Sequence, residues 1–134
     1  MASLRFSIIV PLLITLLCSS HVVVNVSARP RVWVHVFNKC QSGLDILLHC
    51  WSSEDDLGLH VLKHDQMYQF TFCPNIWGST KFECRVQFGD GSEKQFMVYK
   101  FSRDSGGCRH CIWHLRENKA CQLLNGEWVC YDYY

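Results

Sequence analysis

The chain has 134 residues, of which 49% are hydrophobic and 19% charged, with 13 basic residues against 12 acidic ones. This near-neutral balance gives no general attraction to nucleic acid or to anionic membranes, so we exclude those classes of partner. The nine cysteines are more informative, because a small cysteine-rich chain is typical of exported proteins stapled by disulfides.

The N-terminal segment has the three parts of a secretory signal peptide. Residues 1–5 carry one positive charge, residues 6–17 are apolar, and Val26-Ser27-Ala28 ends in the small residue that signal peptidase requires. The apolar run is shorter than the roughly 20 residues of a membrane-spanning helix, so we expect no membrane insertion. We predict a leader at residues 1–28 and one secreted, extracellular domain at residues 29–134.

Period-two alternation of apolar and polar residues dominates the expected mature chain and predicts an all-β fold. In chain order, the alternating runs lie at residues 32–37, 46–50, 68–72 and 81–88. Residues 94–101 are apolar on both faces, which predicts a central strand covered on both sides. No stretch shows a helical apolar stripe of useful length.

Turn-forming residues separate these runs at short, fairly even spacing, at residues 38–43, 52–58, 74–79, 89–91 and 102–107. Short strands between such turns favour a sandwich over a fold of alternating strands and helices. We therefore predict a small, disulfide-stapled antiparallel β-sandwich of about seven to nine short strands.

The C-terminal segment predicts a β-hairpin. Asn125-Gly126 suits a two-residue type I′ turn, which needs positive φ at both central positions. Pairing the chain outward from this turn sets Cys121 opposite Cys130 at a non-hydrogen-bonded position, where Cα atoms lie about 4.5 Å apart. Since a disulfide accepts that distance, we predict a Cys121–Cys130 bridge.

Cys18 lies in the expected leader, so six cysteines remain after this pair is fixed, and they leave about 15 possible connectivities. Cys50, Cys84 and Cys111 each share a strand face with apolar neighbours, so we expect them to point into the core. Cys108 and Cys111 are close together along one segment that we expect to be extended, which disfavours their pairing. We favour Cys50–Cys111, Cys84–Cys108 and Cys40–Cys73.

Four sequence blocks resemble the plant self-incompatibility proteins, also called S-protein homologues. Residues 49–62 resemble the family pattern HC.S.DDLG.H.L, and residues 68–84 resemble Y.F.F..N..G.T.F.C. Residues 96–104 resemble F..Y...RD, and residues 108–113 resemble C..C.W. The blocks follow one another in the family order and together cover nearly all of the expected mature chain.

This resemblance implies a secreted, disulfide-stapled β-sandwich that acts in extracellular signalling or recognition. In the best-known role of the family, a stigma-secreted member is read by a pollen receptor and stops the growth of self pollen. The chain departs from the simplest family pattern in Cys40 and Cys73, and in having Asn118-Lys119-Ala120 where many relatives place a glycine. Neither departure conflicts with the fold.

Enzymatic and metal-binding alternatives find less support. Cys108-Arg109-His110-Cys111 has the spacing of a thiol oxidoreductase, but residues 112–115 alternate as a strand and offer no helix N-terminus to stabilise a thiolate. Two cysteines with one histidine do not close a zinc site, and the acidic run at residues 54–56 lacks the spaced carboxylates of a calcium loop. We interpret that run as a turn before Gly58 in which aspartate side chains bond the backbone.

We therefore predict a non-enzymatic protein without cofactor or metal, acting as a monomeric ligand for a cell-surface receptor protein. Binding is expected on loops carried by a rigid scaffold. The candidate partner-binding residues are Ser53, Glu54, Asp55, Asp56, Leu57, Ser102, Arg103 and Asp104. The alternatives are a small secreted hydrolase such as a nuclease, using two of the histidines, and a secreted effector or defence protein on the same scaffold.

Overall fold

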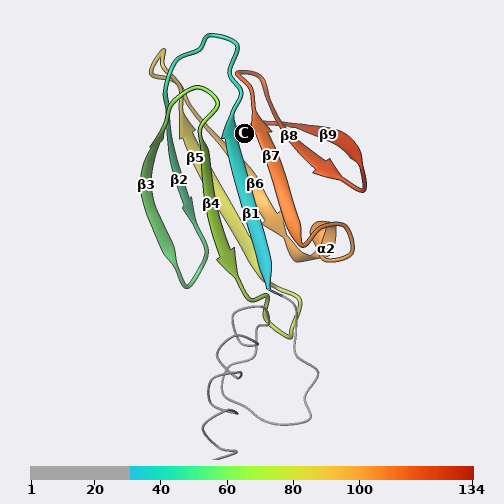
Figure 1. The fold of residues 1–134 in the computed structure, drawn as a ribbon. Coiled ribbons are helices and arrows are strands. Elements are labelled where there is room, and N and C mark those ends of the chain that lie inside the picture. Colours follow the sequence, from blue (N-terminus) through green and yellow to red (C-terminus); the bar gives the residue numbers. More distant parts are fainter. Residues whose placement is uncertain (1–30) are drawn as a thin grey trace, which may run out of the picture.

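The computed structural model describes residues 31–134, so the expected leader at residues 1–28 lies outside the described residues. The elements, in chain order, are β1 (Val32–Asn38), β2 (Ile46–Trp51), β3 (Asp56–Leu62), β4 (Met67–Phe72), β5 (Lys81–Gln87), β6 (Glu93–Lys100), α2 (Phe101–Asp104), β7 (His110–Leu115), β8 (Lys119–Leu124) and β9 (Glu127–Asp132) (Figure 1).

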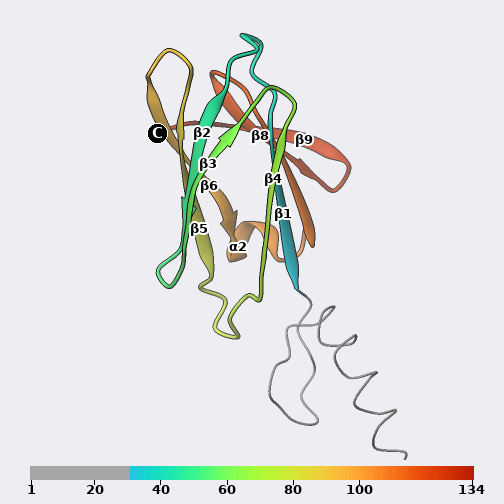
Figure 2. The ribbon, with the colours of Figure 1, turned by 60° about the vertical axis from the view of Figure 1, so that its left-hand side comes forward.

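The strands form two sheets that pack as two layers (Figure 2). One sheet has the strand order β4-β1-β7-β8-β9 and the other has the order β3-β2-β5-β6. The predicted all-β sandwich is thus confirmed. The pair β1–β7 is parallel, whereas all other neighbouring strands are antiparallel. The apolar–polar pattern within each strand does not indicate which strands pair or in which direction, so the sequence did not predict this parallel pair.

The alternating residues supply the core between the layers. Val32, Val34 and Val36 of β1 are buried, as are Phe82, Cys84 and Val86 of β5. The fully buried Trp113 on β7 donates a 2.9 Å hydrogen bond from Nε1 to the Val98 carbonyl on β6. This bond ties the two sheets together at the centre of the core.

Two predicted elements differ from the structure. The strand expected to be central, β6, lies at the edge of its sheet. Phe96, Val98 and Tyr99 are buried in the core. The edge of the strand is partly covered, because Gln95 exchanges two backbone hydrogen bonds with Tyr134. The segment expected as the loop 102–107 begins inside the one-turn helix α2.

The hairpin at the C-terminus matches the predicted register. Asn125 and Gly126 have φ values of 52° and 82°, and Cys121 lies opposite Cys130. The disulfide between these two cysteines, predicted from the turn, is confirmed.

The other predicted pairings are wrong. Cys50 bonds Cys84, because β2 and β5 are neighbours and place these residues directly opposite each other. Cys108 bonds Cys111, because α2 and the following turn precede Cys108 and the segment is not extended. Cys40 is a buried free thiol, whereas Cys73 is disulfide-bonded. These two cannot meet, since they follow antiparallel strands at opposite ends of the sandwich.

Candidate functional site at the loop end of the sandwich

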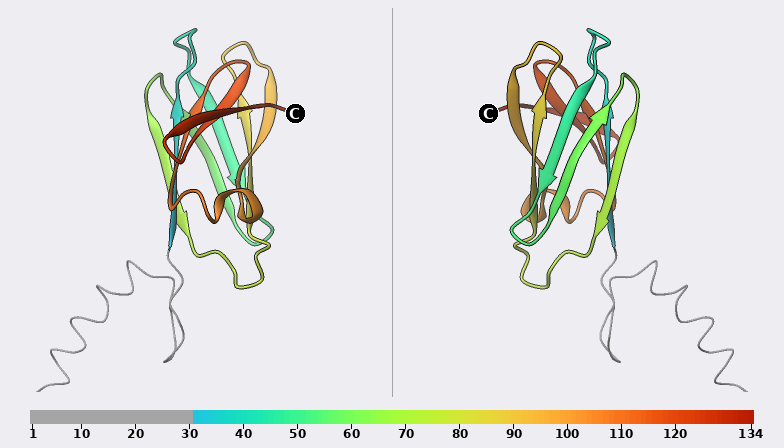
Figure 3. Two further views of the ribbon diagram at one scale, coloured as in Figure 1. Left: turned by 90° about the vertical axis from the view of Figure 1, so that its right-hand side faces the viewer. Right: turned by 90° about the vertical axis from the view of Figure 1, so that its left-hand side faces the viewer.

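Residues 52–55, 73–80 and 101–109 gather at one end of the sandwich, called here the loop end (Figure 3). The strands fix this arrangement, because β2 and β4 both run towards this end while β3 and β5 leave it. Ser53, Glu54 and Asp55, three of the predicted partner-binding residues, are exposed there.

The turn between β2 and β3 is held by its own side chains. Ser52 Oγ accepts hydrogen bonds from the amides of Glu54 and Asp55, at 3.3 and 3.1 Å. Asp56 Oδ1 accepts the Gly58 amide at 2.9 Å, and Gly58 has a φ of 79° that residues with a side chain rarely adopt. This is the aspartate-bonded turn that the sequence predicted.

Asp56 also contacts a histidine on the neighbouring strand. Its Oδ1 lies 2.6 Å from His49 Nε2. The Gly58 amide, followed by His49, lowers the pKa of the Asp56 carboxyl below its usual value. Leu57 is only partly exposed and packs against the core. Asp56 and Leu57 therefore anchor the turn, which leaves residues 53–55 as its freely presented part.

A polar groove of about 220 Å³ separates this turn from the β4–β5 loop. Its walls carry the hydroxyls of Ser52, Ser53, Ser79 and Thr80, the carboxylates of Glu54 and Asp55, and the amino group of Lys81. Charges of both signs with several hydroxyls suit a polar peptide or another protein surface better than an apolar molecule.

The β4–β5 loop presents two large apolar side chains that the sequence analysis did not single out. Trp77 is 82% exposed and Ile76 is 69% exposed, the highest values among the large hydrophobic residues described. Their position inside a turn-forming segment, away from any alternating run, is the signal that could have identified them.

Asn75 holds this loop in one conformation. Its Oδ1 accepts the amides of Trp77 and Ser79, both at 3.1 Å, and its Nδ2 donates to Ser79 Oγ at 2.9 Å. Gly78 has a φ of 74°, and a Cβ there would lie 3.0 Å from the Phe101 ring. The exposed tryptophan is therefore carried on an ordered loop, so that less conformational entropy is lost when a partner binds.

The second predicted segment has a different role in the structure. Ser102 is exposed, but Asp104 is fully buried and Arg103 is mostly covered. Arg103 donates from Nε and Nη2 to the two carboxylate oxygens of Asp104, each at 2.8 Å. Its guanidinium also lies over the rings of Trp113 and Tyr131. These two charges neutralise each other inside the protein, so Asp104 is unavailable to a partner.

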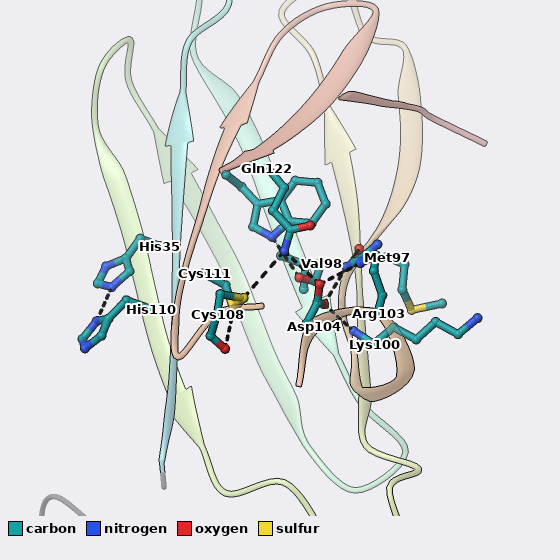
Figure 4. Close-up of a disulfide and its surroundings, with 11 residues drawn as sticks. His35, Met97, Val98, Lys100, Arg103, Asp104, Cys108, His110, Cys111 and Gln122 are labelled. Atoms are coloured by element: carbon teal, nitrogen blue, oxygen red, sulfur yellow. Dashed lines mark hydrogen bonds and ion pairs between the residues drawn. A yellow bond between two sulfur atoms is a disulfide. The ribbon is translucent and has the colours of Figure 1, made fainter. Parts of the chain in front are cut away.

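The buried carboxylate organises its surroundings (Figure 4). Asp104 accepts the Lys100 amide at 2.8 Å and Gln122 Nε2 at 3.0 Å. Arg103 Nη2 additionally donates to the Met97 carbonyl, and Gln122 Nε2 lies 3.8 Å from Cys108 Sγ. This network joins α2 to strands of both sheets and to the Cys108–Cys111 disulfide.

Two histidines meet on the outer face of the five-stranded sheet. His35 Nε2 lies 3.2 Å from His110 Nδ1, and the His110 ring stacks on Trp33. On the same face, the His114 ring lies 4.3 Å from that of Trp128. The sequence alone could not identify this pair, because the contact depends on the parallel register between β1 and β7.

Within residues 31–134, no three His, Cys, Asp or Glu side chains are placed to hold a metal ion.

The environment of His35 and His114 makes stability depend on pH. Desolvation lowers the pKa of both, helped by His110 for His35 and by Lys39 and Arg116 for His114. An unfolded histidine titrates near about 6.5, so the unfolded chain takes up these protons first as the pH falls. We expect the free energy of unfolding, measured in urea, to decrease between about pH 7 and pH 5.

The double variant His35→Gln, His114→Gln tests the origin of this pH dependence. It should flatten the decrease in this window and leave the loss of stability at lower pH, where the carboxyls with lowered pKa values become protonated. An unchanged slope between the two pH values would assign the effect to other groups.

The chain belongs to the plant self-incompatibility protein S1 family, whose pattern it matches over residues 33–133. Among its relatives in Arabidopsis thaliana, S-protein homolog 5 is 42% identical over 93 residues, which cover 69% of this chain and 72% of the relative. S-protein homolog 3 is 33% identical over 107 residues, covering 75% and 71%. S-protein homolog 18 is 29% identical over 126 residues, covering 92% and 87%. The resemblance seen in the sequence is confirmed.

Proposed function

We propose that this protein is a secreted extracellular recognition ligand, which acts as a monomer and binds a cell-surface receptor protein through its loop end. Export follows from the expected leader at residues 1–28 and agrees with the three disulfides between described residues, which form in oxidising compartments. In the residues that the structure describes, no helix is long and apolar enough to cross a bilayer.

The observation that carries this proposal is the exposed Trp77 on the loop that Asn75 fixes. Exposed tryptophans on ordered loops are frequent energetic centres of protein interfaces. The adjacent polar groove, with Glu54, Asp55 and Lys81, supplies the polar rim that such interfaces have. The scaffold beneath is stapled, so the loops keep their geometry in solution.

Binding of the fluorescently labelled secreted protein to responding plant cells tests the proposal. We expect Trp77→Ala to weaken binding about tenfold or more, and the double variant Glu54→Gln, Asp55→Asn to weaken it by a smaller factor. Matched controls are Trp128→Ala, on a different face, and Asp45→Asn, at the opposite end of the sandwich. Both should bind as the unmodified protein does; equal losses in controls and test variants would refute the assignment of the surface.

A secreted hydrolase is the second candidate, and the contact between His35 and His110 is the observation that favours it. Acid–base catalysis requires two such groups at one substrate position. Neither histidine lines the polar groove, however. We expect no hydrolysis of RNA or polysaccharide by the secreted protein. Activity that disappears in His110→Ala would replace the ligand proposal with an enzymatic one.

A further inference from the structure

An apolar hollow of about 500 Å³ opens on the other side of the β4–β5 loop from the polar groove. Val32, Ile76 and Phe101 form much of its wall. The volume lies within the range of about 300–1,000 Å³ that small-molecule sites occupy, and such sites combine apolar walls with a few polar groups. The hollow has this composition.

One tyrosine in the wall offers a hydroxyl that can donate a hydrogen bond. Tyr99 is only 1% exposed and forms part of the wall, with its ring against Phe72. No residue in 31–134 is hydrogen-bonded to its hydroxyl, and the only fully enclosed side-chain polar atom without a partner in that part of the chain is Gln122 Oε1. The Tyr99 hydroxyl therefore keeps access to the hollow that this residue lines. Burial, assisted by the nearby Asp104 charge, raises the pKa of Tyr99 to about 12. The hydroxyl therefore stays protonated and can donate a hydrogen bond.

The charge that lines the hollow is positive. Arg109 is the only charged residue among those lining it, and its side chain is exposed and has no ion-pair partner within the described part of the chain. The Asp104 carboxylate, on the same helix α2 as the lining residue Phe101, is already paired with Arg103. An apolar wall with a guanidinium and a hydroxyl donor is complementary to an apolar group that carries an anionic acceptor.

We propose that this hollow binds a small apolar carboxylate. The ligand's ring or chain packs against Val32, Ile76 and Phe101, and its carboxylate accepts hydrogen bonds from Arg109 and Tyr99. This site lies beside the proposed receptor-binding loop but does not depend on that function.

Calorimetric titration of the secreted protein with 1-naphthylacetate, compared with the neutral 1-naphthylacetamide, tests the proposal. The carboxylate should bind about tenfold more tightly than the amide, because its hydrogen bonds are charge-assisted. Arg109→Gln should remove this preference. Arg116→Gln, which removes the same charge from the far end of β7, should keep it.

Two further measurements locate the site. Amide resonances of Ile76 and Phe101 should shift on titration, and Tyr99→Phe should weaken binding of the carboxylate several-fold while the spectrum of the folded protein is retained. Absence of naphthylacetate binding overturns the proposal, as do equal effects of the two arginine variants. Loss of cell binding in Phe101→Ala without naphthylacetate binding to the unmodified protein would assign the hollow to a protein contact instead.

Discussion

Replacing Asp104 by alanine is expected to lower the free energy of unfolding by about 3–5 kcal/mol, because it breaks a buried ion pair and leaves one charge uncompensated. The Arg103 guanidinium would lose both carboxylate contacts, and the Lys100 amide and Gln122 Nε2 would each lose an acceptor. Urea unfolding followed by tryptophan fluorescence measures the change.

Asp55→Ala is the matched control for this variant. Asp55 is exposed at the same end of the sandwich, and its removal should change stability by less than about 0.5 kcal/mol. If Asp104→Ala changed the free energy of unfolding by as little as Asp55→Ala, the Arg103 side chain would have to reach water once Asp104 is removed. That result would contradict a buried ion pair that contributes to stability.

Removal of the Cys50–Cys84 disulfide by the double variant Cys50→Ala, Cys84→Ala is expected to cost about 3–4 kcal/mol. This bond closes a loop with a sequence separation of 34, whereas Cys121–Cys130 has a separation of 9. Since the loss of chain entropy in the unfolded state grows with loop length, removing the shorter bridge should cost only about 2.5 kcal/mol. The same unfolding measurement compares the two.

The Cys108–Cys111 pair, with a separation of 3, provides the lower end of the series. Its double alanine variant should lose the least stability from loop closure. If instead the order of the three losses is reversed, native contacts around the sulfur atoms outweigh loop closure as the source of stabilisation.

Much of the fold could be predicted because the residues that determine each strand or turn lie close together in the sequence. Alternation in β1 and β5 reflects which face of a strand is buried, and the Asn125-Gly126 turn sets the hairpin register by counting outward from it. The aspartate-bonded turn before Gly58 is equally local. In each case the residues that decide the geometry lie within a few positions of one another.

The parts that could not be predicted depend on which strands become neighbours. Inward orientation of Cys50 and Cys84 was inferred correctly, but their bond follows from the β2–β5 pairing. The contact between His35 and His110 needs the parallel β1–β7 register.

The candidate site shows the same limit in its side chains. Arg103 and Asp104 look like loop residues in the sequence, and only the core beneath them, including Trp113, turns them inward. Ile76 and Trp77 were missed for the opposite reason, since apolar residues are expected to be buried unless a structure shows them exposed.

The parallel pairing of β1 with β7 has a consequence for synthesis of the chain. β1 lies between β4 and β7 in its sheet, and β7 is synthesised only after most of the polypeptide has been made. Before that point β1 can pair only with β4, and a two-stranded ribbon is at best marginally stable. Such distant contacts also slow folding. The five-stranded sheet, and with it the second layer of the sandwich, is therefore expected to form only after the last third of the chain has been made.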